Sequence, residues 1–220
     1  MENNIVNLDA YYYELVMQDK VTISMRVESK EKNKEATLKK LKENIKEVQK
    51  LFKENKLVAQ VSSQSVYEEH DHSGSKVKKT GYWLGSGSVQ VIAYDFDAIN
   101  KVVDELIESD KAQLAQVITS ISEKTKQAKE EEFTTKAIEV FQAKAKNVAK
   151  AFGHQDYSLV NVTVNSASDE GNNMGRQVFA AASLSAMSSV EMAGGSEESS
   201  YISPRESKIY VNIKGSVQLK

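Results

Sequence analysis

The sequence of 220 residues contains no cysteine, a single proline and only ten glycines. The absence of cysteine excludes disulfides, thiol nucleophiles, iron–sulfur clusters and cysteine-ligated zinc. Because glycine and proline interrupt helices and strands, their scarcity predicts that most of the chain lies in regular elements. No uncharged apolar run approaches the ~18 residues that a membrane span requires.

An excess of charge of one sign is also lacking, since there are 29 lysines and arginines, 31 aspartates and glutamates, and a net charge of −2. General nucleic-acid binding normally needs a strong basic excess, so we expect no nucleic-acid partner. The first residues have no basic start followed by an apolar core, and are therefore not an intact signal peptide. Either the protein is not exported, or Met1 stands where a native leader was.

The first half of the chain shows alternating and helical hydrophobic patterns in turn. Residues 21–29 alternate apolar and polar side chains, which predicts a half-buried strand. Residues 34–56 carry one apolar stripe at helical spacing, and Asn33 is a candidate N-cap for the helix. Two strands are expected next, over 58–68 and 76–94, and the glycines at 85 and 87 indicate a bulge or a close backbone approach.

The second half continues in the same way. Asp95 is a candidate N-cap for a helix that ends near residue 109. A strand is expected over 113–121 and a long helix over 126–152. Two alternating segments, at 157–164 and 209–219, predict the last two strands.

The helix over 126–152 is notable for small residues around one aromatic ring. Its apolar stripe consists of Phe133, Ala137, Val140, Phe141, Ala145, Val148 and Phe152. Ala137 and Ala145 permit close approach to a sheet, and Phe141 is expected to fill the space between them. Lys144 lies on the flank of the stripe, where we expect a surface position. Gly153 stands where a helix favours a left-handed residue after its end.

The element order predicts an α+β fold of two β-α-β-β units, 21–94 and 113–219, joined by the helix at 95–109. Antiparallel sheets packed against helices are the expected arrangement. The stretch of about 165–206 is rich in serine, alanine, glycine, glutamate and methionine. We expect it to be a long flexible or partly helical insertion, because structureless loops of that length are unusual in compact domains.

Two segments carry a family resemblance. The segment TGYWLGSGSVQVIAYDFDAINKVVDELIES contains a Gly-Tyr pair, alternating valines and an aspartate that opens a helix, and KAIEVFQAKAKNVAKAFG is an alanine-repeat helix that ends in glycine. In this order they resemble the SIMPL-domain family, which includes bacterial periplasmic immunogenic proteins. The resemblance covers about 21–219, so we expect residues 1–20 to be an N-terminal extension and 21–220 a single SIMPL-like domain.

The resemblance implies a function in outline. Bacterial members are typically exported to the periplasm or cell envelope, some form ring-like or channel-like homo-oligomers, and some are linked to tolerance of oxidative stress. The animal member is a signalling adaptor for a kinase. No catalytic residues are established for the family, so we expect no enzyme activity, no catalytic residues and no cofactor. The expected partners are further copies of the chain, with a protein or peptide as a second candidate.

One segment contains a dense group of side chains that can bind metal ions, namely Glu68, Glu69, His70, Asp71 and His72. In an extended segment the two imidazoles would point to the same side and, with a carboxylate, could hold zinc or copper. The alternative is a polar, charged hairpin tip, and we predict no metal site. His154 is expected to be a capping or surface residue.

Two further features have competing interpretations. The GSGS sequence at 85–88 is discounted as a phosphate loop, because it lies within a predicted strand with no helix directly after it. Tyr82 and Trp83 could line a groove or an interface, but core packing is the commoner role. Three functions stay open: a self-assembling envelope protein that binds a partner or ligand, an intracellular adaptor, and a metal-binding protein or metal-dependent enzyme that uses the Glu68–His72 cluster.

Overall fold

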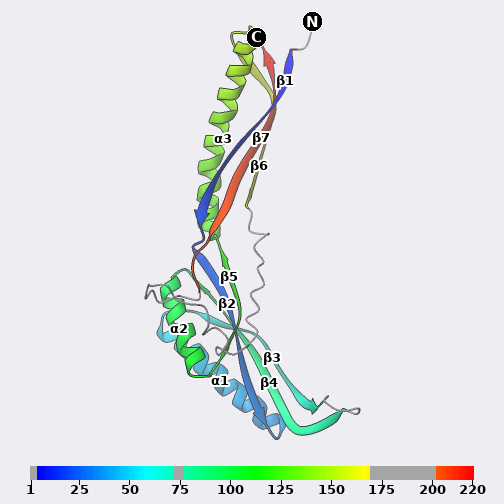
Figure 1. Cartoon of the computed structure of the whole chain (residues 1–220), viewed down its shortest axis with the longest axis vertical. Coiled ribbons are helices and arrows are strands. Elements are labelled where there is room, and N and C mark those ends of the chain that lie inside the picture. Colours follow the sequence, from blue (N-terminus) through cyan, green and yellow to red (C-terminus); the bar gives the residue numbers. More distant parts are fainter. Residues whose placement is uncertain (1–3, 72–76, 169–201) are drawn as a thin grey trace, which may run out of the picture. The chain divides into compact units, whose positions relative to one another are not determined.

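The computed structural model describes residues 4–71, 77–168 and 202–220. In these residues the chain forms three helices and two antiparallel sheets, which confirms the α+β prediction. The chain divides into two compact units, each with its own sheet and hydrophobic core. We refer to them by their sheets as the three-stranded unit and the four-stranded unit (Figure 1).

The four-stranded unit contains six consecutive elements. They are β2 (Lys20–Glu31), α1 (Lys34–Glu54), β3 (Ala59–Asp71), β4 (Lys78–Ala93), α2 (Phe96–Glu108) and β5 (Gln113–Ser120). The strand order in the sheet is β3-β4-β2-β5, and β4 pairs antiparallel with both β2 and β3. Residues of α1 and α2 share one core with the inward side chains of β2 and β4, so both helices cover the same face of this sheet.

Helix α1 begins and packs as its sequence predicts. The side chain of Asn33 accepts a hydrogen bond from the Ala36 amide at 2.7 Å, which satisfies one of the unpaired N–H groups at the helix start. The buried residues of the helix are Thr37, Leu41, Ile45, Val48 and Phe52.

Two of the glycines of β4, Gly85 and Gly87, permit the close approach of α1. A Cβ at Gly87 would lie 2.6 Å from Cδ1 of Ile45, and one at Gly85 would collide with the Ser29 hydroxyl. The register shifts between β3 and β4 lie elsewhere: one is at Ser62 of β3, between Val61 and Ser63, and the other is where Glu68 and His70 pair with Trp83 and Lys79 of β4. Of the two interpretations of these glycines, close packing is therefore the right one.

Helix α2 is a core element of the four-stranded unit. Its N-cap is Asp95, whose carboxylate accepts hydrogen bonds from the amides of Asp97 and Ala98. Asn100 is buried, and its side chain donates to the carbonyl of Ile202 at 2.7 Å and accepts from the Ile202 amide at 3.0 Å. Ile202, which follows the undescribed segment 169–201, is thereby held in this core.

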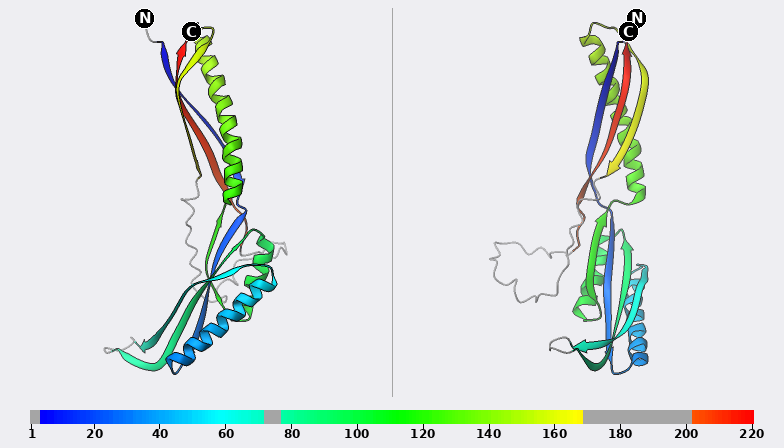
Figure 2. Two further views of the ribbon diagram at one scale, coloured as in Figure 1. Left: turned by 180° about the vertical axis from the view of Figure 1, so that it is seen from behind. Right: turned by 90° about the vertical axis from the view of Figure 1, so that its right-hand side faces the viewer.

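The three-stranded unit combines elements from both ends of the sequence. They are β1 (Ile5–Met17), α3 (Glu123–Ala151), β6 (Tyr157–Ser168) and β7 (Glu206–Leu219). The order is β1-β7-β6, and β7 pairs antiparallel with both neighbours. The right-hand view of Figure 2 shows the three strands side by side in this order, coloured blue, red and yellow, in front of α3.

The core of this unit lies between α3 and one face of the sheet. Alternate residues of β7 are buried, namely Ile209, Val211, Ile213, Val217 and Leu219. On α3 the buried residues are Phe133, Ala137, Phe141, Ala145 and Ala149. Phe141 lies over Gly215, where an added Cβ would come within 3.0 Å of the ring and 2.6 Å of the Asn161 carbonyl oxygen.

The predicted stripe of α3 is correct at its centre and wrong at its edges. Val140 and Phe152 are 42% and 69% exposed, whereas Ala149 is buried. The buried positions recur at every fourth residue, so the line of contact with the sheet winds slowly around the helix, and Val140 lies outside it. Phe152 is the C-cap, beyond the last helical residue, and the left-handed Gly153 follows it.

Several sequence expectations are revised by the strand pairing. Residues 5–17, expected within an N-terminal extension, form β1 and pair with β7 along its length. The strand expected at 113–121 does not belong to the second β-α-β-β unit. It is β5, which joins the sheet of β2, and the third strand beside β6 and β7 is β1. Most of the expected insertion at 165–206 lies outside the described residues, although 165–168 belong to β6.

The helix expected from residue 126 begins earlier, because Ser122 and Asp19 both cap it. The Ser122 hydroxyl accepts from the Thr125 amide, and the Asp19 carboxylate accepts from the Ser122 amide at 2.6 Å and the Thr125 hydroxyl at 2.6 Å. Burial raises the pKa of Asp19, but these hydrogen bonds outweigh it and leave the pKa below its usual value. The negative charge also interacts favourably with the positive end of the helix dipole.

Candidate functional site

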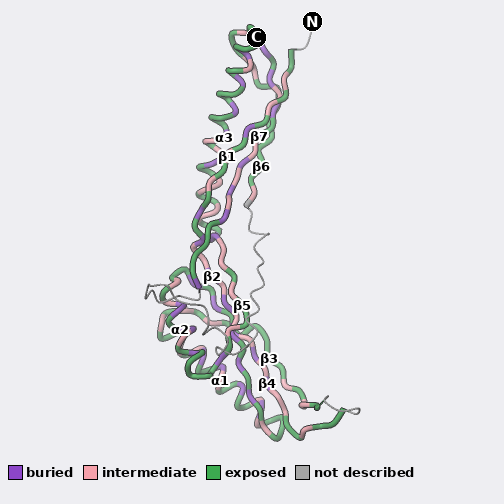
Figure 3. The backbone as a smooth tube through the Cα atoms, in the orientation of Figure 1, coloured by how far each residue is buried: buried purple, intermediate pink, exposed green. Residues whose placement is uncertain are grey.

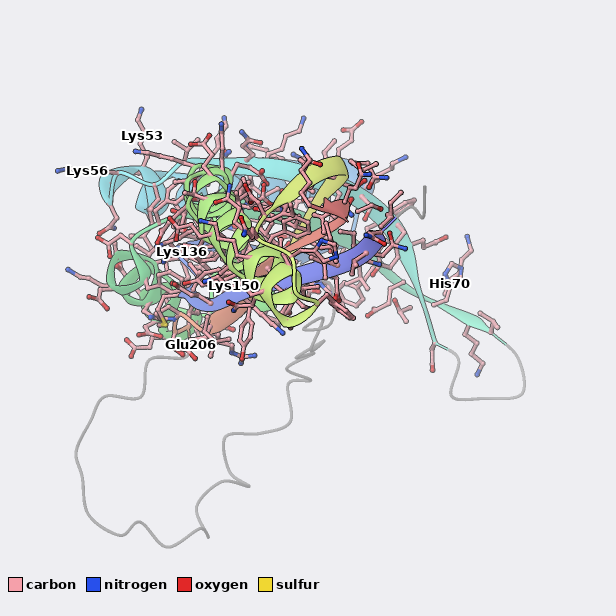
Figure 4. All side chains as sticks on the ribbon, turned by 90° about the horizontal axis from the view of Figure 1, so that it is seen from above. Lys53, Lys56, His70, Lys136, Lys150 and Glu206 are labelled. Atoms are coloured by element: carbon pink, nitrogen blue, oxygen red, sulfur yellow. The ribbon has the colours of Figure 1, made fainter. Side chains whose placement is uncertain are left out.

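The predicted metal-ligand group lies at the end of the β3–β4 hairpin, where Figure 4 labels His70. His72 is outside the described residues. Glu68 pairs with Lys79 at 2.9 Å, and the Nδ1 atom of His70 lies 2.9 Å from the Glu68 carbonyl oxygen. Within the described residues, no three histidine, aspartate or glutamate side chains are placed to hold a metal ion.

Glu69, in the same segment, is bound by two groups from neighbouring elements. Its carboxylate lies 2.7 Å from the Lys30 ammonium and accepts from the Thr80 hydroxyl at 2.7 Å. The hydrogen bonds from Lys30 and Thr80 lower the pKa of Glu69. This carboxylate therefore joins β2, β3 and β4 at the hairpin as a charged surface contact.

The Gly-Tyr-Trp sequence follows the same hairpin. Tyr82 is 38% exposed, and the Lys30 ammonium lies 4.8 Å from its ring centroid. Trp83 is half-buried, with Lys34 at 5.8 Å. Neither ring belongs to the buried core, so core packing does not describe them.

A cavity of about 470 Å³ lies in the four-stranded unit beside α1 and the turn before β5. Its charged lining consists of Arg26, Glu28, Lys30, Glu47, Asp110 and Lys111. Lys111 pairs with Glu47 at 3.5 Å, and the Ser29 hydroxyl donates to the Thr37 carbonyl at 3.0 Å. These contacts join β2, α1 and the turn before β5. The Ser29 hydroxyl is hydrogen-bonded to a backbone carbonyl and not to a side chain that could act as a general base.

The open face of the three-stranded unit carries a tyrosine cluster that sequence reasoning missed. Tyr11, Tyr13 and Tyr210 lie on the face opposite α3, with ring centroids 5.5 Å apart for Tyr11 and Tyr13 and 5.7 Å apart for Tyr11 and Tyr210. The Lys208 ammonium lies 4.2 Å from the Tyr13 centroid and 5.1 Å from that of Tyr11. The alternation of Tyr11, Tyr13, Leu15 and Met17 was the signal that could have revealed a strand here.

The edge strand β6 is the second unusual surface of this unit. Leu159, Val162 and Val164 are paired with the inward residues of β7, yet they are 54%, 46% and 43% exposed. Figure 3 shows this strand mostly in the colour of exposed residues. The valine alternation correctly predicted the strand, and its apolar side is exposed because α3 packs mainly over β1 and β7.

A family comparison accounts for both units together. The family model of SIMPL, described as a protein of unknown function (DUF541), matches residues 9–217. The chain belongs to the SIMPL family. The resemblance inferred from the two motifs is thereby confirmed, and the match includes most of β1, which we had placed outside the domain.

Other comparisons add little to the SIMPL assignment. No curated protein matches the chain. Among solved structures, a de novo designed protein, Foldit4, is similar over 47% of this chain and 98% of its own, with 18% identity and a TM-score of 0.26. That score is too low to support an argument about fold. Across the described residues, no helix is long and apolar enough to cross a membrane.

Proposed function

We propose that this SIMPL protein is a non-enzymatic protein of the cell envelope that self-assembles and binds a partner or ligand. The observation that carries the proposal is the exposed apolar row on β6. An edge strand offers unpaired backbone N–H and C=O groups to another strand. When apolar side chains line the same strand, a second copy can add main-chain hydrogen bonds and bury apolar surface in one step.

The opposite edge of the same sheet is protected, which makes β6 the better candidate. Beside β1, the Lys144 ammonium donates to the Asp9 carbonyl at 2.8 Å, and Lys136 pairs with Glu14 at 2.9 Å. Lysines placed along an edge strand are a common defence against pairing with another chain. In the described residues, β6 has no strand on its other side and no such lysine contacts.

The row on β6 also suits a symmetric interface. Two copies of β6 that pair antiparallel would bring Leu159, Val162 and Val164 of one copy beside the same residues of the other. Each square ångström of apolar surface so buried contributes about 25 cal/mol. Such a contact uses the same patch on both subunits, as two-fold dimers do.

The envelope location, the absence of enzyme activity and the link to oxidative stress come from what the family resemblance implies. The intracellular adaptor is the competing proposal. Fractionation of cells that express the native gene from its own start codon separates the two. Recovery in the periplasmic or envelope fraction supports the first, and recovery in the cytosol with the initiator methionine retained contradicts it.

Self-assembly is tested by light scattering coupled to size exclusion over a wide concentration range. We expect a particle larger than the 24.5 kDa monomer. Val164→Lys should shift it towards the monomer, because a charge on an edge strand opposes pairing. The matched control is Ile92→Lys, which places the same charge at a residue 51% exposed on β4. A monomer at every concentration, or equal effects of both variants, would contradict the proposal.

A further inference from the structure

The open face of the three-stranded unit is a regular grid of outward side chains. The register aligns Asn7 with Ser216 and Asn161, Asp9 with Lys214 and Thr163, Tyr11 with Asn212 and Asn165, and Tyr13 with Tyr210 and Ala167. Three strands and four rows thus give a polar half, rich in amides and hydroxyls, that continues into an aromatic half. The right-hand view of Figure 2 looks onto this face.

Hydrogen bonds orient the amides of the polar half. The Ser216 hydroxyl donates to Oδ1 of Asn7 at 2.6 Å, and the Ser216 amide donates to Oδ1 of Asn161 at 3.1 Å. Because both side-chain oxygens are already engaged, both amides present their Nδ2 donors to a ligand. An open depression of about 460 Å³ lies at this place, lined in part by Asn7, Asn161, Thr163 and Lys214.

The aromatic half offers exposed rings with a positive charge beside them. Tyr11 and Tyr13 are 44% and 52% exposed. Their ring faces are electron-rich and attract the polarised C–H groups of a sugar ring as well as cations. Lys208, at the aromatic end, and Lys214, in the polar half, are six residues apart on β7, or roughly 20 Å in a strand.

We propose that this face binds an acidic polysaccharide in an extended conformation. Sugar rings would pack on Tyr11 and Tyr13, hydroxyl groups would accept from the amides of Asn7 and Asn161, and carboxylates would approach Lys208 and Lys214. The inference deepens the proposed function, since it names the ligand class, but it uses the open face rather than β6.

The charge on the face favours a polysaccharide over a single-stranded nucleic acid. Stacked bases also bind aromatic side chains, but a nucleic acid carries one phosphate per nucleotide and needs a continuous basic groove. Here two lysines stand far apart on β7, and Asp9 and Glu206 lie on the same face. Such spacing matches a chain with a carboxylate on some of its sugars.

The test is isothermal titration calorimetry of the full chain with hexasaccharides of hyaluronan, in which every second sugar is a uronate, with dextran oligosaccharides and with a single-stranded DNA of twelve thymidines. We expect binding to the uronate chain, weaker binding to dextran and none to DNA. Tyr13→Ala should weaken uronate binding about tenfold or more, which corresponds to about 1.4 kcal/mol. Lys214→Met should weaken it by a smaller factor and reduce its salt dependence.

Two controls separate stacking from general effects. Tyr13→Phe keeps the ring and should bind within about twofold of the wild type. Tyr67→Ala removes a tyrosine that is equally exposed, at 52%, from β3 of the other unit and should have no effect. Binding that survives Tyr13→Ala, equal affinity for dextran, tighter binding to DNA, or no binding at all would each overturn the inference.

Light scattering on the same samples keeps the two proposals apart. A wild-type protein that oligomerises but does not bind the uronate chain contradicts the polysaccharide site alone. Binding by a protein that is monomeric at every concentration contradicts self-assembly through β6 alone. Thermal unfolding of each variant is recorded beside its binding, and Lys214→Met supplies a second variant at an exposed position if Tyr13→Ala does not fold.

Discussion

The two units cover their sheets with different numbers of helices. In the four-stranded unit, α1 and α2 lie over four strands, and every inward residue of the two central strands from Val21 to Val27 and from Val89 to Ala93 is buried. In the three-stranded unit, the single 29-residue helix α3 lies over three strands. A helix with its side chains is about 10–12 Å wide, and neighbouring strands are about 4.8 Å apart. One helix therefore covers about two strands, and β6 is left open.

The difference teaches that an exposed apolar strand can follow from architecture alone. The apolar side of β6 faces the same way as the buried residues of β7, yet nothing in the described chain covers it.

The opposite edge of the sheet, at β1, is instead lined by a network of charged side chains. Hydrogen bonds from Lys129 and Lys136 lower the pKa of Glu132 to about 2, and Lys136 also binds Glu14.

The largest expected effect comes from removing the ring between α3 and its sheet. Phe141→Ala should reduce the free energy of unfolding of the three-stranded unit by roughly 3–5 kcal/mol, through lost burial and the cavity left over Gly215. Hydrogen exchange during denaturant titration identifies which unit is affected. Equal loss of protection in β2 and β7 would show that the two cores are not independent in the way their separate clusters indicate.

A smaller effect, in the other unit, is expected from the buried amide of α2. Asn100→Ala orphans the buried amide and carbonyl of Ile202, and each unsatisfied group costs about 1–3 kcal/mol. Protection of β2 and α2 should fall, while that of β1 and β7 should not. A variant as stable as the wild type would mean that water replaces both hydrogen bonds.

The third prediction concerns acid and the capping aspartate of the three-stranded unit. Since the folded-state pKa of Asp19 is lowered, its contribution to stability is present above the unfolded pKa of about 3.9 and is lost as the pH falls through the folded value. Asp19→Asn should therefore destabilise the protein at pH 7 and differ progressively less from the wild type below about pH 4. Unfolding curves between pH 7 and pH 2 measure this, and a constant difference across the range would refute the capping role of the charge.

The smallest effect is expected at the protected edge. Lys144→Ala removes the exposed contact with Asp9, at 3.3 Å between Nζ and Oδ1, and exposed pairs contribute about 0.2–1 kcal/mol. Its midpoint in denaturant should lie close to that of the wild type and far from that of Phe141→Ala. If β1 is open to pairing without this lysine, light scattering will show larger particles for Lys144→Ala, which would sharpen the contrast with β6.

Much of the local structure was determined by the sequence itself. Apolar spacing predicted all three helices and six of the seven strands of the described chain, and Asn33 and Asp95 marked helix starts by their capping chemistry. The missed strand was β1, because apolar residues occupy both of its faces, with Tyr12 and Val16 on one and Tyr13 and Leu15 on the other, so that its alternation is weak. The two SIMPL motifs were likewise sufficient for the family, which the family model confirms.

Partnerships between distant segments were decided only by the tertiary structure. Period-two alternation determines which face of a strand is buried but not which strand it pairs with, so the sequence could not assign β5 to β2 or β1 to β7. The candidate surfaces depend on those pairings. Tyr210 contacts Tyr11 and pairs with Tyr13 only because β7 returns beside β1. The valines of β6 are exposed only because one helix is too narrow to cover three strands.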